Sequence, residues 1–214
     1  MKLLHVASSP RRSRSISLQL ANHFLESLGE HQPTLSVDEL DVWKTDLPPF
    51  DGAALDAKYA SLSGAAMTSD QEAIWQQIEE LGERFRRADL ILFSVPMWNF
   101  GIPYRLKHLI DVVTQRGILF EFGEVGLRGL LTDVRAIICA ARGVAIGPDY
   151  PPDDYERQIS YLETWCRMVG IRDVDVILSQ ATLGGPDVAE ANVAAARAEA
   201  SRVAARAARV VPAR

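Results

Sequence analysis

The chain has 214 residues, of which 48% are hydrophobic and 24% are charged, and its formal net charge is -5. This length predicts a single domain spanning residues 1–214, and the acidic balance argues against nucleic-acid binding. No apolar run reaches the roughly 18 residues of a membrane helix, so we expect no membrane contact. Two cysteines in apolar stretches, Cys139 and Cys166, and the lack of a signal-peptide core predict a cytoplasmic protein with buried thiols.

A short apolar run at residues 2–7 predicts a strand, and we interpret His5 within it as a core histidine with a nearby partner. The loop that follows, Ser8–Ser17, is rich in serine and arginine and precedes a helix expected at residues 17–28. Hydroxyl groups beside the free N–H groups of a helix start form an anion site. The glycine motifs of nucleotide-binding loops are absent, so a terminal phosphate fits this loop better. Alternatively, Ser15 or Ser17 only caps the helix.

The next elements carry core positions. Residues 34–42 predict a strand and residues 55–67 a weak helix. A further helix is expected to begin near Ser69, where Ser69 and Glu72 match a capping box. Its predicted apolar face consists of Ile74, Ile78, Leu81 and Phe85.

The most informative stretch is Leu90–Gly101. It begins as an apolar run without alternation, which is typical of a strand buried on both faces. Pro96 cannot donate to a sheet ladder, so we expect the strand to end there. Large apolar groups and an asparagine then form a loop before Pro103 opens a helix. A flat apolar surface beside free backbone amides suits a planar heteroaromatic ring such as a flavin, although these residues could simply close the core.

In the second half, Gly117–Gly129 predicts an ordered excursion such as a hairpin or a pocket wall. Residues 133–141 predict a buried strand that leads into a loop, Ala141–Gly147, where Gly143 allows close approach of a ligand. The remaining predicted elements are a helix at residues 155–168, a strand at 173–178 and a helix at 188–211.

Five predicted strands alternate with helices, which indicates an α/β fold: a parallel sheet with helices on both faces. In such sheets, ligands bind at the carboxyl ends of the strands. The three unusual loops, Ser8–Ser17, Pro96–Gly101 and Ala141–Gly147, all follow strands. We therefore expect one loop to bind a phosphate, one to face a flavin ring and one to close over its pyrimidine edge.

These motifs resemble the FMN-dependent NADH azoreductases, also described as NADH:quinone oxidoreductases, which have a flavodoxin-like five-stranded parallel sheet. The resemblance spans nearly the whole chain, and Pro96–Pro103 is its most specific part. It implies the following cofactor-binding residues: Ser9, Ser15, Ile16 and Ser17 for the FMN phosphate; Met97, Trp98, Asn99 and Phe100 for the ring; and Ala141, Arg142, Gly143 and Val144 in the third loop.

The sequence departs from the family pattern in four places. Family members often have Ser and Gly where this chain has Ala141 and Val144, which would narrow the pocket. Trp98 and Phe122 stand where tyrosines are usual, so aromatic faces remain but phenolic groups are lost. The resemblance implies that Phe120 and Phe122 line the substrate pocket.

The family implies that hydride passes from NADH or NADPH to FMN, and that a quinone or azo compound then takes two electrons at the same place. The chemistry belongs to the cofactor, so we name no catalytic side chain and no metal. The resemblance also implies a homodimer with the pocket at the subunit interface. Two alternatives remain open: a flavodoxin-type electron carrier, and an FMN reductase that releases reduced flavin.

Overall fold

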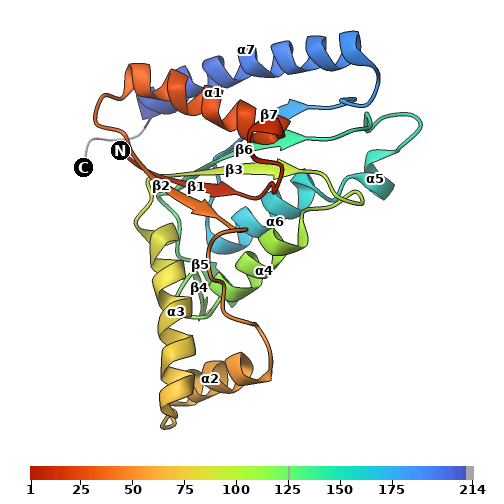
Figure 1. Ribbon diagram of the computed structural model, residues 1–214. Helices are drawn as coiled ribbons and strands as arrows, with labels where there is room; N and C mark the ends of the chain where they lie inside the picture. The colour runs from red at the N-terminus through yellow and green to blue at the C-terminus, as the bar shows by residue number, and fades with distance from the viewer. Residues whose placement is uncertain (125, 211–214) are drawn as a thin grey trace.

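A computed structural model describes residues 1–124 and 126–210 of the chain. Its centre is a sheet of five parallel strands, as predicted, and the strand order is β2-β1-β3-β6-β7 (Figure 1). The strands are β1 (Lys2–Ala7), β2 (Ser36–Asp41), β3 (Leu90–Pro96), β6 (Arg135–Ala141) and β7 (Val174–Ser179). Because β1, β3 and β6 are neighbours, the loops that follow them open side by side at one edge.

Helices cover both faces of the sheet (Figure 1). The two that cover one face are α1 (Ile16–His31) and α7 (Pro186–Val210). The helices of the other face are α3 (Ser69–Arg86), α4 (Tyr104–Val113) and α6 (Ile159–Val169). The other helical segments of the described residues are η1 (Arg12–Arg14), α2 (Gly52–Ser63), which packs on α3, and α5 (Pro152–Tyr155).

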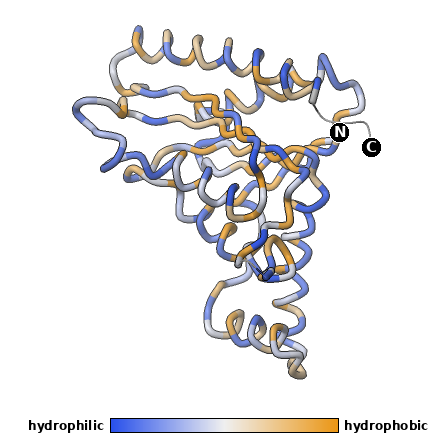
Figure 2. Tube along the Cα trace, turned by 180° about the vertical axis from the view of Figure 1, so that it is seen from behind, coloured by the Kyte–Doolittle hydropathy of each residue, from blue (hydrophilic) through white to orange (hydrophobic). Residues whose placement is uncertain are grey.

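Strand β3 shows why the central apolar run lacks alternation. Leu90 and Leu92 point into the core under α1 and α7, whereas Ile91 and Phe93 point into the other core. Both side-chain sets are fully buried, so both faces of the strand favour apolar residues. Figure 2 shows mostly hydrophobic strands between helices along which hydrophobic and hydrophilic residues alternate.

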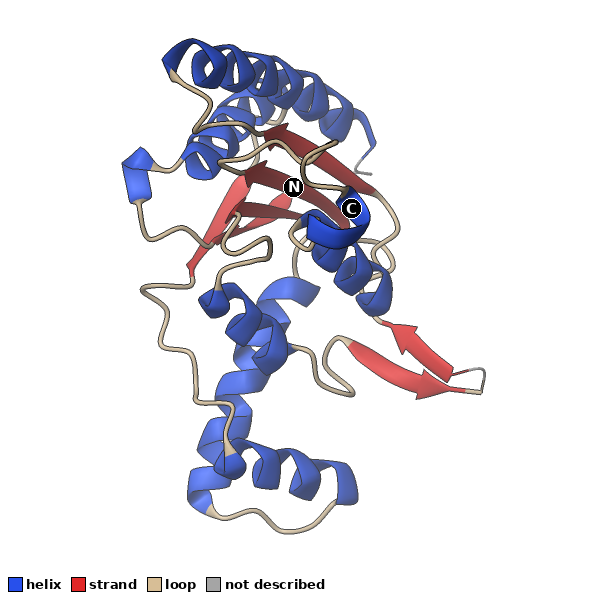
Figure 3. Cartoon of the chain, turned by 90° about the vertical axis from the view of Figure 1, so that its right-hand side faces the viewer, coloured by secondary structure: helices blue, strands red, loops and turns tan. Residues whose placement is uncertain are grey.

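A separate antiparallel hairpin, β4 (Phe120–Gly123) and β5 (Gly126–Gly129), confirms the excursion predicted between α4 and β6. Val125 lies outside the described residues. Figure 3 shows the hairpin projecting from the body of the molecule. Its base is fixed where Gly129 meets the end of α6: a Cβ there would lie 2.0 Å from the Val169 carbonyl carbon, so only glycine fits.

Several predicted helix boundaries were wrong. The helix expected at residues 17–28 spans Ile16–His31, and the weak helix expected at residues 55–67 spans Gly52–Ser63. The capping box of α3 uses Thr68 and Gln71 instead of Ser69 and Glu72, with both reciprocal hydrogen bonds present. The helix predicted from residue 155 begins at Ile159, because the carboxylate of Glu156 caps its first amides. The last helix begins at Pro186 instead of residue 188, and the predicted end of that helix, Val211, lies outside the described residues.

Among the helices of residues 1–124 and 126–210, none is both long enough and apolar enough to cross a membrane.

Candidate functional site

The predicted phosphate and ring loops are tied together at the carboxyl edge of the sheet. The Ser8 amide and Ser8 Oγ both donate to the Ser94 carbonyl oxygen on β3, at 3.1 and 2.7 Å. The Met97 amide donates to the Ala141 carbonyl oxygen at the end of β6, at 2.8 Å. The structure therefore places the loops after β1, β3 and β6 next to one another.

The first loop forms a buried cradle of hydroxyl groups at the start of α1. Ser15 is the N-cap: its Oγ accepts from the Leu18 amide at 3.5 Å and lies 3.1 Å from Ser17 Oγ. Ser9, in the same loop, is also buried, and within the described part of the chain the amides of Ile16 and Ser17 have no backbone acceptor. Buried hydroxyls and free amides at a helix N-terminus fit a phosphate group.

The ring loop is a tight two-residue turn. Trp98 and Gly101 exchange two backbone hydrogen bonds, at 3.0 and 2.9 Å, across Asn99 and Phe100. Both central residues have positive φ angles, 48° and 64°, which asparagine tolerates but phenylalanine rarely adopts. Such strain costs roughly 1–3 kcal/mol and is typical of functional sites.

Surrounding contacts hold the strained turn in place. The Arg157 amide donates to the Phe100 carbonyl oxygen at 3.0 Å. The Phe100 ring packs against Tyr155 and Tyr150, with centroid separations of 4.8 and 5.7 Å. These three aromatic rings close the side of the turn that faces α5.

Trp98 joins a second aromatic group with Trp43 and Tyr104. The Trp43 ring lies 5.9 Å from Trp98 and 5.5 Å, edge to face, from Tyr104. Trp43 Nε1 also donates to the Ser8 carbonyl oxygen at 3.0 Å. One tryptophan after β2 thus links the phosphate loop to the ring loop.

In the third loop, the side chain of Arg142 turns away from the solvent and is only 6% exposed. Its guanidinium donates to Gln180 Oε1 at 2.9 and 3.1 Å and pairs with Glu156 at 3.4 Å. Burial lowers the pKa of Arg142, and the Glu156 charge opposes that shift. The side chain therefore braces the loop, and the Arg142 backbone is also engaged: its amide donates to the Ser179 carbonyl, and its carbonyl accepts from Thr182.

Glu156 connects this brace to α6. Burial would raise its pKa, but hydrogen bonds from the amides of Ile159 and Ser160, and the charge of Arg142, hold the pKa below its ordinary value. Nearby, fully buried Gln158 donates through Nε2 to the Val95 carbonyl at 2.9 Å. Its second, longer bond to the Ala141 carbonyl, 3.4 Å, joins the ends of β3 and β6.

The remaining residues of the third loop contact a fourth strand-end loop, which the sequence analysis missed. The Gly143 carbonyl accepts from the Leu183 amide at 3.1 Å, and a Cβ on Gly143 would meet Leu183 Cδ1 at 2.7 Å. Leu183 is 83% exposed beside the partly buried Val144. The signal available in the sequence was the Gly184–Gly185 break directly after the last strand.

Phe120 and Phe122 are not brought together with these loops within one chain. They lie on the hairpin, which packs on the end of α6 that precedes β7, away from the carboxyl edge. Their rings contact each other edge to face at 5.7 Å, and Phe122 is 63% exposed. A place for them in a substrate pocket would require a second copy of the chain.

The histidine and the two cysteines that were predicted to lie in the core are buried there. His5 Nε2 lies 3.0 Å from Ser94 Oγ in the core, and burial lowers the pKa of His5 to about 4. Cys139 and Cys166 are buried free thiols, and burial raises the pKa of each, for Cys166 to about 12. In the described ranges, no group of three potential metal ligands occurs.

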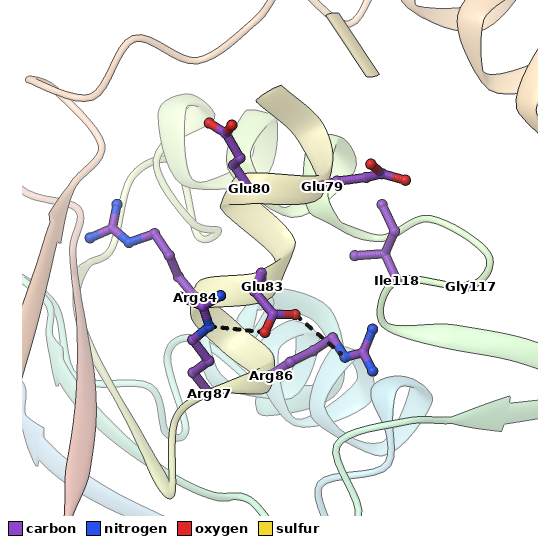
Figure 4. A pocket seen from close by; sticks show the side chains of 8 residues that line it. All are labelled: Glu79, Glu80, Glu83, Arg84, Arg86, Arg87, Gly117 and Ile118. Carbon is purple, nitrogen blue, oxygen red and sulfur yellow. Dashed lines mark hydrogen bonds and ion pairs between the residues drawn. The ribbon is translucent and has the colours of Figure 1, made fainter. Parts of the chain in front are cut away.

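A cavity of ≈450 Å³ lies elsewhere, beside the last turns of α3 (Figure 4). Its lining is charged, and Glu83 pairs there with Arg86 and Arg87. Because α3 leads into the start of β3, this cavity is at the amino side of the sheet. Its three glutamates and three arginines balance in charge, and it shares no residue with the strand-end loops.

Known proteins share this sequence and architecture. A family model described as flavodoxin-like fold matches residues 1–204. The FMN-dependent NADH:quinone oxidoreductase 2 of Pseudomonas syringae pv. tomato is 60% identical over 205 residues, 96% of this chain and 98% of that protein. The FMN-dependent NADH:quinone oxidoreductase 9 of Burkholderia lata is 42% identical, over 86% of this chain and 89% of that protein.

Solved structures agree with these relatives. The crystal structure of an azoreductase from Bacillus anthracis strain Sterne has a TM-score of 0.89 at 26% identity, covering 96% of this chain and 99% of that one. An FMN-dependent NADH-azoreductase from Bacillus anthracis, in complex with FMN, has a TM-score of 0.82 at 25% identity, with 95% and 99% covered.

Proposed function

Because the chain belongs to the FMN-dependent NADH:quinone oxidoreductases, which share the flavodoxin-like fold, we propose that it passes hydride from NADH or NADPH, by way of bound FMN, to quinones and azo compounds. The observation that carries this proposal is the meeting of a buried hydroxyl cradle and a strained aromatic turn at one sheet edge. One part fits a phosphate and the other a flat ring, and FMN has both.

The chain's own residues would bind and orient the cofactor. Ser9, Ser15 and Ser17, with the amides of Ile16 and Ser17, would hold the phosphate. The ring would lie against Met97, Trp98, Asn99 and Phe100, and the backbone of residues 141–144 would close over its pyrimidine edge.

When bound, FMN supplies the two-electron redox chemistry. Backbone N–H groups near Asn99 and Gly143 would stabilise negative charge at the ring edge, so no side-chain acid or base is needed. The nicotinamide would leave before the acceptor enters, because both need the same face of the ring.

We further propose a homodimer whose pocket lies at the subunit interface. Large apolar side chains are exposed on the hairpin, at Phe122 and Leu127, and on α2, at Leu55, Tyr59 and Leu62. Exposed apolar patches on projecting elements are typical of interfaces. The hairpin of one copy would bring Phe120 and Phe122 to the site of the other.

The two cores share one sheet, which supports a single FMN-binding domain for residues 1–214. The unpaired, buried thiols of Cys139 and Cys166 support a reducing compartment, so we propose a cytoplasmic location.

The testing experiment is a visible absorption spectrum of the purified protein, followed by anaerobic NADH and then benzoquinone. We expect a yellow protein that bleaches with NADH and regains its colour with quinone. A colourless protein that also ignores added FMN would contradict the proposal. Loss of flavin from the protein on reduction would favour an FMN reductase. Electron transfer to protein partners, but not to quinone, would favour an electron carrier.

A further inference from the structure

A groove of ≈770 Å³ opens beside the Trp98–Gly101 turn and along α4. This volume is typical of a small-molecule site, for which roughly 300–1,000 Å³ is usual. Trp98 and Asn99 line both the groove and the proposed ring site, so the two are continuous. The rest of the lining is mostly aromatic or apolar, including Phe50, Ile102, Tyr104 and Tyr161.

The groove also carries charge, and most of that charge is already paired. Lys107 binds both carboxylate oxygens of Asp111, at 2.6 and 2.7 Å. His108 Nε2 is bound to the Pro48 carbonyl at 2.9 Å. The remaining charged side chain of the lining is that of Arg157. No ion pair among the described residues includes Arg157. The lining therefore has a net positive charge.

The structure holds the guanidinium of Arg157 without neutralising it. Its Nη atoms donate to two backbone carbonyls, those of Glu156 at 3.0 Å and Asp153 at 2.5 Å. Its own amide is bound to Phe100 in the ring turn, at 3.0 Å. Carbonyl groups carry no formal charge, so a fixed, exposed cation remains beside the turn. A guanidinium of this kind suits carboxylate, sulfonate or phosphate groups.

We propose that Arg157 is a specificity-determining residue that binds an anionic group on the ligand over the ring turn. This inference rests on the proposed function. It names the substrate class: planar aromatic quinones or azo compounds that carry a carboxylate or sulfonate. The pyrophosphate of the nicotinamide dinucleotide is also an anionic group that Arg157 could bind. The acceptor and the dinucleotide can be tested separately because they act in different half-reactions.

The first experiment compares naphthoquinone sulfonate with unsubstituted naphthoquinone as acceptors. In Arg157→Gln we expect kcat/KM for the sulfonate to fall by about three- to fivefold, the upper part of the range of an exposed charge contact. The unsubstituted quinone should stay within about twofold, and Arg157→Lys should restore most of the sulfonate preference. Arg197→Gln, an exposed arginine on α7 at the far face, removes the same charge as a control.

A second arm addresses the reductive half-reaction. Flavin bleaching is followed with NADH and with reduced N-benzylnicotinamide, which lacks the pyrophosphate. If NADH bleaches the flavin of Arg157→Gln more slowly than that of the wild type, whereas reduced N-benzylnicotinamide bleaches both at the same rate, the proposal is supported. The dinucleotide is then identified as a source of the anion. Binding is measured independently with naphthalene sulfonate, a redox-inactive probe, by quenching of tryptophan fluorescence.

The proposal is overturned if the variant treats the charged and uncharged ligands of both half-reactions alike, or if naphthalene sulfonate binds it as tightly as the wild type. These outcomes differ from a failure of the proposed function, in which the wild-type protein would neither retain FMN nor respond to NADH.

Discussion

At the scale of single residues, the phosphate cradle depends on two hydroxyl groups. In Ser15→Ala/Ser17→Ala we expect FMN affinity to fall by about tenfold or more, since hydrogen bonds to a charged group contribute roughly 1.5–3 kcal/mol each. Titration of the apoprotein measures this. Ser27→Ala is a matched control, because that serine lies on the same helix and binds Ser201 instead. Undiminished affinity in the double variant would contradict the phosphate site.

Ser15 also caps α1, so its loss should lower the free energy of unfolding by about 1 kcal/mol. Unfolding should therefore be measured on the same variant, in the absence of FMN. A fall in FMN affinity larger than this loss of stability separates a direct contact from a weakened helix.

His5 makes a prediction about pH. Burial, opposed by the charge of Asp41, lowers its pKa from 6.5 to about 4. The unfolded chain thus takes up a proton at a higher pH than the folded chain does. Stability is full above pH 6.5 and falls as the pH drops towards 4, by up to roughly 3 kcal/mol. In His5→Gln this part of the acid sensitivity should vanish, and an unchanged slope of unfolding free energy against pH would contradict it.

At the scale of elements, Glu156 links the third loop to α6. In Glu156→Gln the buried Arg142 loses its partner charge, and we expect the free energy of unfolding to fall by about 2 kcal/mol. FMN should also dissociate faster, because Gly143 follows Arg142 directly. The folded pKa of Glu156 lies below the unfolded value, so in the wild type this contribution is present above about pH 4.5 and is lost as the pH falls further.

Chemical denaturation and the rate of flavin release check this prediction. Glu83→Gln removes the two surface ion pairs with Arg86 and Arg87 near the end of α3 and should change the free energy of unfolding by less than about 1 kcal/mol. If Glu156→Gln and Glu83→Gln lose equal free energy of unfolding, the contact between Glu156 and Arg142 contributes no more than a surface ion pair does.

At the scale of the whole molecule, the sequence predicted those features that follow from a repeating pattern or from neighbouring residues. Alternating strands and helices indicated the parallel sheet, and the composition of the strand-end loops indicated the site. It could not show that the Arg142 side chain turns towards Glu156 and Gln180, because that choice depends on loops far apart in the sequence. The contact of Trp43 with Ser8 and Trp98 was missed for the same reason.

The hairpin shows most clearly which features could not be predicted from the sequence. Its glycines and aromatics predicted an ordered excursion, and the structure confirms one. Which surface it covers depends on packing between Gly129 and Val169, which no local pattern encodes. Within one chain the hairpin leaves Phe122 and Leu127 exposed, so its apolar face is explained only if something covers it.

The homodimer proposal supplies that cover and can be tested. In Phe122→Ser/Leu127→Ser we expect the dimer dissociation constant, measured by analytical ultracentrifugation, to rise by more than about a hundredfold, because each buried large apolar side chain contributes roughly 1.5–3 kcal/mol. Activity should fall at dilutions where the variant is monomeric, since Phe120 and Phe122 would then no longer reach the partner's site. Val37→Ser, an equally exposed apolar position on β2, should change neither quantity. A wild-type protein that light scattering shows to be a fully active monomer at nanomolar concentration would contradict the dimer, and the hairpin would then need another partner.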